Sequence, residues 1–200
     1  LVENPLINRN GHYEMDFEQL EETFKNGAKA FILCSPHNPV GRVWTKEELQ
    51  KIADLCVQYN VYLFSDEIHA DIVFSGHQHT PIASLNHDIE QLTFTLMAPS
   101  KTFNIAGLQA SYVISPNEEL KKKVDQQLMR QGFASLNTFA FIALETVYNH
   151  GENWLDDLII QLENNKKLID QKLANSSVDI TAADTEGTYL IWLDFTKTGL

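Results

Sequence analysis

Three side chains that could do chemistry each follow an apolar run typical of a buried strand. The runs are AFILC from residue 30, VYLF from residue 61 and TFTLM from residue 93, and beyond them come Asn38, Asp66 and Lys101. Short apolar runs bounded by turn residues indicate buried strands. In open sheets of parallel strands, ligands bind beyond the carboxyl ends of the strands. The sequence therefore predicts an amide, a carboxylate and an amine at one edge of a sheet.

Each of the three residues also has a simpler interpretation. Asn38 opens the stretch Asn-Pro-Val-Gly, which forms a good turn by itself. Asp66 could cap the helix or loop that follows it. Lys101 could be an ordinary solvated lysine in a loop, since lysines are mostly exposed.

A metal site is a sharper alternative. Glu67, His69 and Asp71 alternate along the sequence, so on an extended strand they would share one face. No further residues gather into a ligand set, because His77 and His79 lie beside a glycine in a loop that we expect to be exposed. We therefore predict no metal site.

A lysine, an aspartate and an asparagine together also suit pyridoxal 5'-phosphate (PLP). A lysine amine bonds covalently to the aldehyde of this cofactor. An aspartate keeps its pyridine nitrogen protonated, so that the ring can accept electrons from a carbanion. An amide can donate to the ring oxygen. On the residues alone, PLP chemistry is a hypothesis beside the others.

Hydrophobic periodicity predicts an α/β fold. Four runs, AFILCSP, VYLFSDEI, TFTLMAPS and QASYVIS, indicate strands of a mainly parallel sheet covered on both faces by helices. A helix is expected over 17–26, and a capping box of Thr45 and Glu48 opens another with Leu49, Ile52, Ala53 and Cys56 on one stripe.

The two ends of the chain differ from this middle part. Long helices are predicted over about 118–131, 135–149 and 152–174, followed by a strand near 187–195. The opening residues contain turn formers but predict no strand or helix. We therefore expect a fragment, or a chain whose ends were lost.

Composition excludes several classes of function. The net charge of −12 argues against nucleic acid as a partner. Cys34 and Cys56, the two cysteines, sit in apolar surroundings, which favours free buried thiols in a reducing compartment over a disulfide. No apolar run approaches the ~18 residues of a membrane span, and we expect no signal peptide. We expect a cytoplasmic protein with no membrane partner.

Three motifs carry a resemblance to a known family: SPHNPVGRVWTKEEL, SDEIHADIVF and APSKTFNIAGLQASY. In this order and spacing they resemble the fold-type I PLP enzymes of the aspartate aminotransferase superfamily, and most closely the PatB/MalY-type carbon–sulfur β-lyases. The resemblance implies that Lys101 forms the Schiff base and that Asp66 pairs with the pyridine nitrogen. It further implies that Asn38 donates to the ring oxygen and that Ser100 contacts the phosphate.

Two positions depart from the aminotransferase pattern. His69 stands where aminotransferases commonly have a cofactor-contacting tyrosine, and Gln109 stands where they commonly have a phosphate-binding arginine. Both substitutions resemble the β-lyase branch. Gln109 is therefore a doubtful phosphate ligand, whereas His69 is a candidate cofactor-binding residue.

The resemblance implies a fold, a division into domains and an activity. Residues 1–143 would be the central part of the PLP-binding large domain, with a mixed, mainly parallel sheet whose fourth strand is antiparallel. Residues 144–200 would be the interdomain helix and the start of a small α+β domain. The implied activity is cleavage of cystathionine or a related cysteine conjugate to thiol, pyruvate and ammonia, by a homodimer in the full-length parent.

Two alternatives stay open at this point. One is an aminotransferase on the same scaffold. The other is a non-catalytic fragment of such an enzyme. Because the family takes its phosphate cup and its substrate-binding arginine from sequence outside these 200 residues, we expect the isolated chain to bind PLP poorly and to be inactive.

Overall fold

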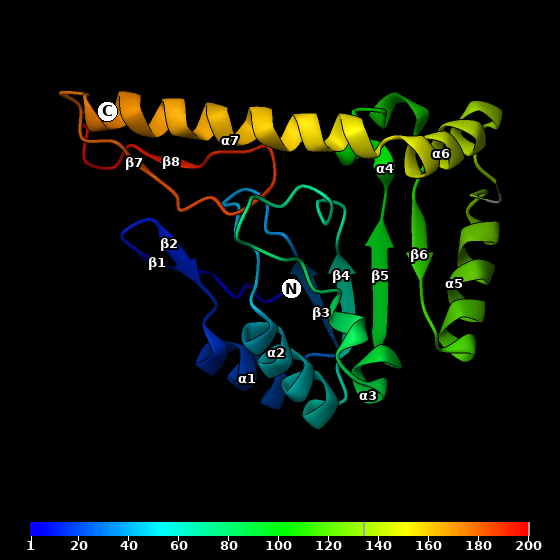
Figure 1. Cartoon of the computed structure of the whole chain (residues 1–200). Coiled ribbons are helices and arrows are strands. Elements are labelled where there is room, and N and C mark those ends of the chain that lie inside the picture. The colour runs from blue at the N-terminus through cyan, green and yellow to red at the C-terminus, as the bar shows by residue number, and fades with distance from the viewer. Residues whose placement is uncertain (134, 200) are drawn as a thin grey trace.

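The centre of the fold is a four-stranded sheet in a computed structural model that describes residues 1–133 and 135–199. The strands lie in the order β3 (Ala30–Cys34), β4 (Tyr62–Asp66), β5 (Thr93–Met97) and β6 (Tyr112–Ile114). β3, β4 and β5 run parallel and β6 runs antiparallel to β5 (Figure 1). The predicted α/β fold with a mixed, mainly parallel sheet is confirmed, and so is the antiparallel fourth strand.

The core lies between this sheet and the helices α1 (Phe17–Lys25) and α2 (Lys46–Tyr59). The short elements η1 (Ile82–Ser84) and α3 (His87–Glu90) pack against α2. The buried cluster includes Leu20, Phe24, Leu33, Trp44, Leu49, Ile52, Ala53, Cys56, Leu63, Ile82 and Ile89. The stripe predicted for α2 is therefore its buried face.

α2 begins as the sequence predicts. The Thr45 hydroxyl accepts a hydrogen bond from the Glu48 amide at 3.2 Å, and the Glu48 carboxylate accepts one from the Thr45 amide at 2.8 Å. These two bonds satisfy amide groups that have no partner inside the helix. The capping box fixes where the crossover from β3 to β4 starts.

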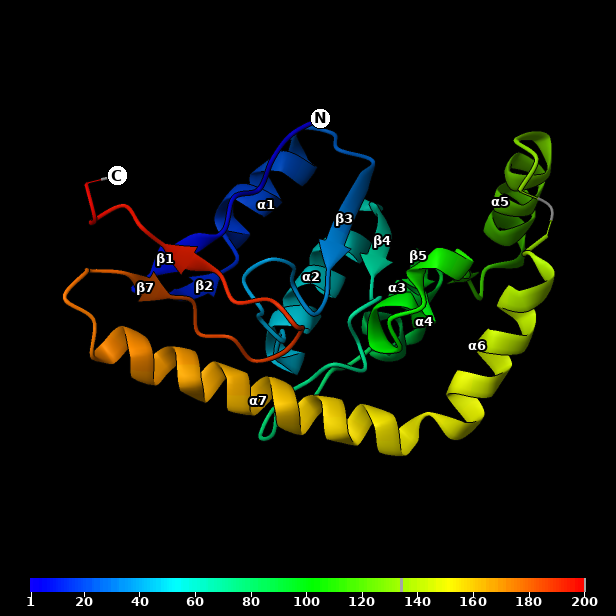
Figure 2. The ribbon, with the colours of Figure 1, turned by 90° about the horizontal axis from the view of Figure 1, so that it is seen from above.

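Three long helices follow the sheet, as predicted: α5 (Glu118–Arg130), α6 (Thr138–His150) and α7 (Glu152–Ala174). α7 runs along one side of the molecule, and the carboxyl ends of β4 and β5 point toward it (Figures 1 and 2). No α7 residue is fully buried. The proposed domain boundary at residue 143 falls inside α6, and the division into two domains stays a prediction.

The expectation that the opening residues form no strand is wrong. β1 (Ile7–Arg9) and β2 (His12–Glu14) pair as an antiparallel hairpin. Asn10 and Gly11 between them have φ values of 55° and 97°. Two-residue hairpin turns of this kind need positive φ at both central positions, which asparagine and glycine adopt most readily. The pair Asn-Gly therefore explains the hairpin.

The strand predicted near 187–195 is also largely wrong. Only β8 (Leu193–Asp194) is a strand there, and it pairs with β7 (Thr181–Ala182). The residues before β8 bond to loops instead, since the Gly187 amide donates to Gly41 O and the Thr188 amide donates to Ile72 O. The segment is anchored to the body of the protein rather than extended along a sheet.

The structure also bears on the two cysteines and on possible membrane spans. Cys34 and Cys56 are both free thiols, as predicted. Cys56 is buried, which raises its pKa to about 12, whereas Cys34 is only partly buried. Among the described residues, no helix is long and apolar enough to cross a membrane.

Candidate active site

The strand-end residues follow three neighbouring parallel strands at one edge of the sheet. Cys34, the last residue of β3, is the register partner of Asp66, the last residue of β4. Asn38 lies four residues beyond Cys34, and the backbone amide of Asn38 donates to Cys34 Sγ at 3.3 Å. Lys101 lies in α4 (Pro99–Thr102), the short helix that follows β5. The sheet register therefore brings the three elements that carry these groups to the same edge.

His69 lies beside two of these residues. Burial lowers the pKa of His69, the nearby Lys101 ammonium lowers it further, and the Asp66 carboxylate acts in the opposite direction. The residue is 2% exposed, and neither ring nitrogen has a hydrogen-bond partner among the described residues. Its ring meets that of Tyr189 edge-on, with 5.3 Å between centroids. The lowered pKa favours the neutral imidazole. Its two ring nitrogens are buried without a hydrogen-bond partner among the described residues, which is rare in folded proteins.

The simpler interpretations of the strand-end residues hold in part. The segment after Asp66 is a turn rather than a helix, and Asp66 Oδ1 accepts only a long bond, 3.3 Å, from the Ile68 amide. Lys101 is half-buried rather than freely solvated. Asn38 is exposed and belongs to the turn that its sequence predicts. Ser100, beside Lys101, donates from its hydroxyl to Ala110 O at 3.4 Å.

The geometry contradicts the metal site considered for Glu67, His69 and Asp71. β4 ends at Asp66, so the three side chains do not share the face of an extended strand. Asp71 instead accepts a hydrogen bond of 2.8 Å from the Thr102 hydroxyl in α4. That bond links the turn after β4 to the helix that carries Lys101.

Glu67 belongs to a buried pair that sequence reasoning missed. Its carboxylate accepts from the Ser65 hydroxyl at 2.8 Å and lies 2.9 Å from His79 Nε2. The prediction that His79 is exposed is wrong, since 9% of its side chain is accessible, whereas His77 is exposed as expected. This contact joins Glu67, the first residue after β4, to His79, 12 residues further along the chain.

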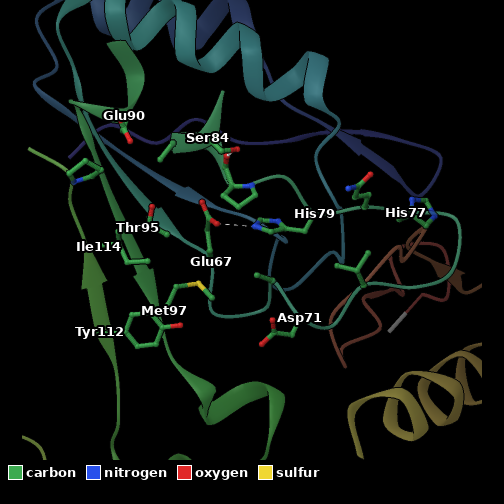
Figure 3. Close-up of a pocket in the computed structure, with 16 residues that line it drawn as sticks. Glu67, Asp71, His77, His79, Ser84, Glu90, Thr95, Met97, Tyr112 and Ile114 are labelled. Carbon is green, nitrogen blue, oxygen red and sulfur yellow. Dashed lines mark hydrogen bonds and ion pairs between the residues drawn. The ribbon is translucent and has the colours of Figure 1, made fainter. Parts of the chain in front are cut away.

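An apolar cavity of about 720 Å³ lies next to this pair. Figure 3 shows Glu67 and His79 in its wall, together with Thr95 and Met97 from β5 and Tyr112 from β6. Lys101, Asp66 and His69 do not line it. The cavity is therefore not the candidate active site, although Glu67 in its wall directly follows Asp66 in sequence.

A second buried ionic network joins distant parts of the chain. Arg42, 3% exposed, donates from Nε to Glu186 at 2.9 Å and from Nη2 to both Glu48 oxygens at 3.0 and 3.2 Å. Its Nη1 bonds Tyr13 O, and its guanidinium lies 4.8 Å from the Trp44 ring centroid. Arg42 stands in the SPHNPVGR motif, but nothing in the sequence indicated these partners.

Comparisons with known proteins fit this geometry. Residues 6–198 match the family described as aminotransferase class I and II. The chain belongs to that family. It is 44% identical over 201 aligned positions to cystathionine beta-lyase PatB of Bacillus subtilis, covering 100% of this chain and 52% of PatB. The crystal structure of cystalysin from Treponema denticola, which contains a pyridoxal 5'-phosphate cofactor, superposes with a TM-score of 0.94 at 37% identity and covers 100% of this chain and 51% of cystalysin.

Other family members carry a transaminase name. Human kynurenine–oxoglutarate transaminase 3 is 40% identical over 109 residues, which cover 54% of this chain and 24% of that protein. The chain spans about half the length of the first two relatives. It is thus a class I and II aminotransferase relative with strong similarity to carbon–sulfur lyases, as the motifs indicated.

Proposed function

We propose that the protein containing this chain is a PLP-dependent carbon–sulfur β-lyase. It would cleave cystathionine or a related cysteine conjugate to thiol, pyruvate and ammonia. The observation that carries the proposal is the environment of His69. A buried imidazole without a hydrogen-bond partner, within reach of the charges of Lys101 and Asp66, offers polar atoms to a bound ring.

The donor set fits PLP. Lys101 would supply the amine that bonds to the cofactor aldehyde, and Asp66 would accept from the pyridine nitrogen. Asn38 and His69 would face the ring oxygen, and Ser100 would contact the phosphate. When bound, PLP supplies an electron sink for the carbanion formed at the substrate Cα.

The reaction would break the Cα–H bond and the Cβ–S bond, and one water would then hydrolyse the C–N bond. Lys101, displaced by the substrate amine, would take the Cα proton as general base. Asp66 would hold a proton at the pyridine nitrogen throughout. The Cβ–S bond would then break as the thiolate leaves with its electron pair, and hydrolysis of the remaining product gives pyruvate and ammonia.

The test measures products with a full-length protein that contains this chain. With PLP and cystathionine, we expect pyruvate and free thiol in equal amounts without any keto-acid acceptor. Lys101→Ala should abolish the reaction and also the cofactor attachment that borohydride fixes. Lys121→Ala, at an exposed lysine of α5, is the matched control and should keep both.

An aminotransferase is the second candidate, favoured by the similarity to a kynurenine transaminase. Amino-group transfer that depends on a keto acid, without thiol release, would establish it in place of the lyase. If mass spectrometry located the reduced cofactor on another lysine, the assignment of Lys101 would be wrong under either activity.

We also propose a cytoplasmic homodimer. Two free thiols suit a reducing compartment. α5, α6 and the turn between them expose large apolar side chains, which suit subunit contact. They are Leu128, Met129, Phe133, Phe139, Phe141 and Ile142.

A further inference from the structure

A mixed cluster of ligand-type side chains contains none of the candidate active-site residues. His12, Asp184 and Glu186 offer ring-nitrogen and carboxylate atoms that all lie within 4.8 Å of one another. His12 Nδ1 and Asp184 Oδ2 are 3.3 Å apart. The three residues come from opposite ends of the chain, where β2 and β7 lie side by side (Figure 2).

The backbone holds this cluster in place. The Asp184 amide donates to Gly11 O at 2.9 Å, which seats Asp184 against the residue before His12. The Glu186 amide donates to Gly41 O at 2.8 Å, and the Phe74 amide donates to Glu186 O at 2.9 Å. Backbone hydrogen bonds thus join four segments far apart in sequence around the cluster, at Gly11, Gly41, Phe74 and 184–186.

Glu186 is the buried member and keeps one oxygen available. Its Oε2 accepts from Arg42 Nε at 2.9 Å and from the Val43 amide at 2.7 Å. Its Oε1 accepts no hydrogen bond from the described residues and lies 4.0 Å from His77 Nδ1. Only 10% of the Glu186 side chain is exposed, so Glu186 is the buried ligand of the cluster.

The charge around the cluster favours a divalent cation. Glu48 and Glu186 both pair with the Arg42 guanidinium, and Asp184 adds a third carboxylate, which leaves two negative charges uncompensated when His12 and His77 are neutral. One divalent ion would neutralise both. Imidazole among the ligands selects transition metals over calcium and magnesium, which prefer oxygen alone.

We propose that His12, Asp184 and Glu186 bind one zinc ion, with water as the fourth ligand. Zinc lies about 2.0–2.2 Å from nitrogen and oxygen ligands, so neighbouring ligands of a tetrahedral site are about 3.4 Å apart. His12 and Asp184 already have this separation, and rotation of exposed side chains closes the rest. Zinc would join the N-terminal hairpin to the segment after β7, independently of PLP.

The test measures metal binding by a full-length protein that contains this chain. After metal removal, zinc is titrated in competition with a chromophoric chelator, and cobalt(II) serves as a spectroscopic probe. We expect one zinc per chain and the intense visible absorption of four-coordinate cobalt. The melting temperature should rise with zinc concentration, since a ligand that binds the folded state stabilises it.

Variants decide which residues bind. His12→Ala and Asp184→Asn, both at largely exposed side chains, should each weaken zinc binding by at least about tenfold. His87→Ala is the matched control, because His87 lies 3.2 Å from Glu90 in a two-residue surface pair, and it should leave affinity unchanged. Unaltered binding in both variants, or an equal loss in the control, would overturn the proposal. A weak cobalt spectrum typical of octahedral coordination would also overturn it. That spectrum is recorded with the unaltered protein, so it does not depend on whether the variants fold.

Discussion

Arg42→Met should destabilise the protein far more than loss of an ordinary surface charge. The guanidinium makes hydrogen bonds to Glu186 and to both oxygens of Glu48, and only 3% of the residue is exposed. Methionine keeps the length of the side chain but none of these donors. Glu186, with 10% of its side chain exposed, would be left as a buried carboxylate that retains only the Val43 amide as donor.

The magnitude follows from this burial. Removing one partner of a buried ion pair costs about 3–5 kcal/mol, because the remaining charge is uncompensated. For a protein of 150–250 residues, each kcal/mol lowers the melting temperature by about 2–4 °C. We therefore expect Arg42→Met to lower it by about 6–20 °C. Adding Glu186→Gln should recover part of the loss, since the charge left behind is then removed too, with a coupling of at least about 1 kcal/mol.

Urea unfolding and thermal melts followed by circular dichroism measure these effects. Arg9→Met is the matched control, because Arg9 forms a pair of 3.0 Å with Glu14 on the surface, where 63% and 42% of the two side chains are exposed. Such pairs contribute about 0–1 kcal/mol. The reasoning would be refuted if Arg42→Met cost no more than Arg9→Met, or if the double variant showed no coupling.

Two further predictions concern the loops at the sheet edge. Asp66→Asn in a full-length protein should leave cofactor attachment intact but slow turnover by several orders of magnitude, each tenfold corresponding to about 1.4 kcal/mol of barrier; a loss of less than about tenfold would contradict the role of Asp66. Burial, and secondarily the Arg42 charge, lowers the pKa of His37 from 6.5 to about 4, so between these values the unfolded state binds more protons than the folded state. Stability should therefore fall as pH is lowered through this window, by up to about 1.4 kcal/mol per pH unit, and urea unfolding of His37→Gln should show a shallower fall; an unchanged slope would contradict the assignment.

Local signals account for the parts of the fold that the sequence predicts correctly. The capping box at Thr45, the apolar runs of the four strands and the stripe of α2 each lie within a few residues, and all three hold in the structure. The hairpin at β1 and β2 had an equally local signal, Asn10-Gly11, which is among the strongest short-range indications of a hairpin. It was missed because the flanking strands are three residues long and show little apolar alternation.

The candidate site was predictable to the extent that strand order was. Once β3, β4 and β5 are parallel neighbours, the elements that carry Asn38, Asp66 and Lys101 must end at one edge. The partners of Glu67 and Arg42 were not predictable. His79 lies 12 residues from Glu67 and Glu186 lies 144 residues from Arg42, and no periodicity relates either pair. Such pairs are brought together by tertiary packing, which no local sequence pattern encodes.

The segment before β8 shows why a correct apolar pattern can still predict the wrong element. GTYLIWL has the composition of a strand, yet Thr188 adopts a φ of 68°, outside the region that a strand requires. Its amide donates to Ile72 O, and a Cβ on Gly187 would lie 2.7 Å from that same oxygen. Only glycine permits this approach at position 187, where the chain forms an isolated antiparallel bridge with Val73 rather than a continuous ladder. Residues 187–188 therefore bond to the loops that follow β3 and β4. The next residue, Tyr189, contacts the buried ring of His69 edge-on. The segment that the pattern indicated as a strand therefore supplies Tyr189, whose ring packs against that of His69.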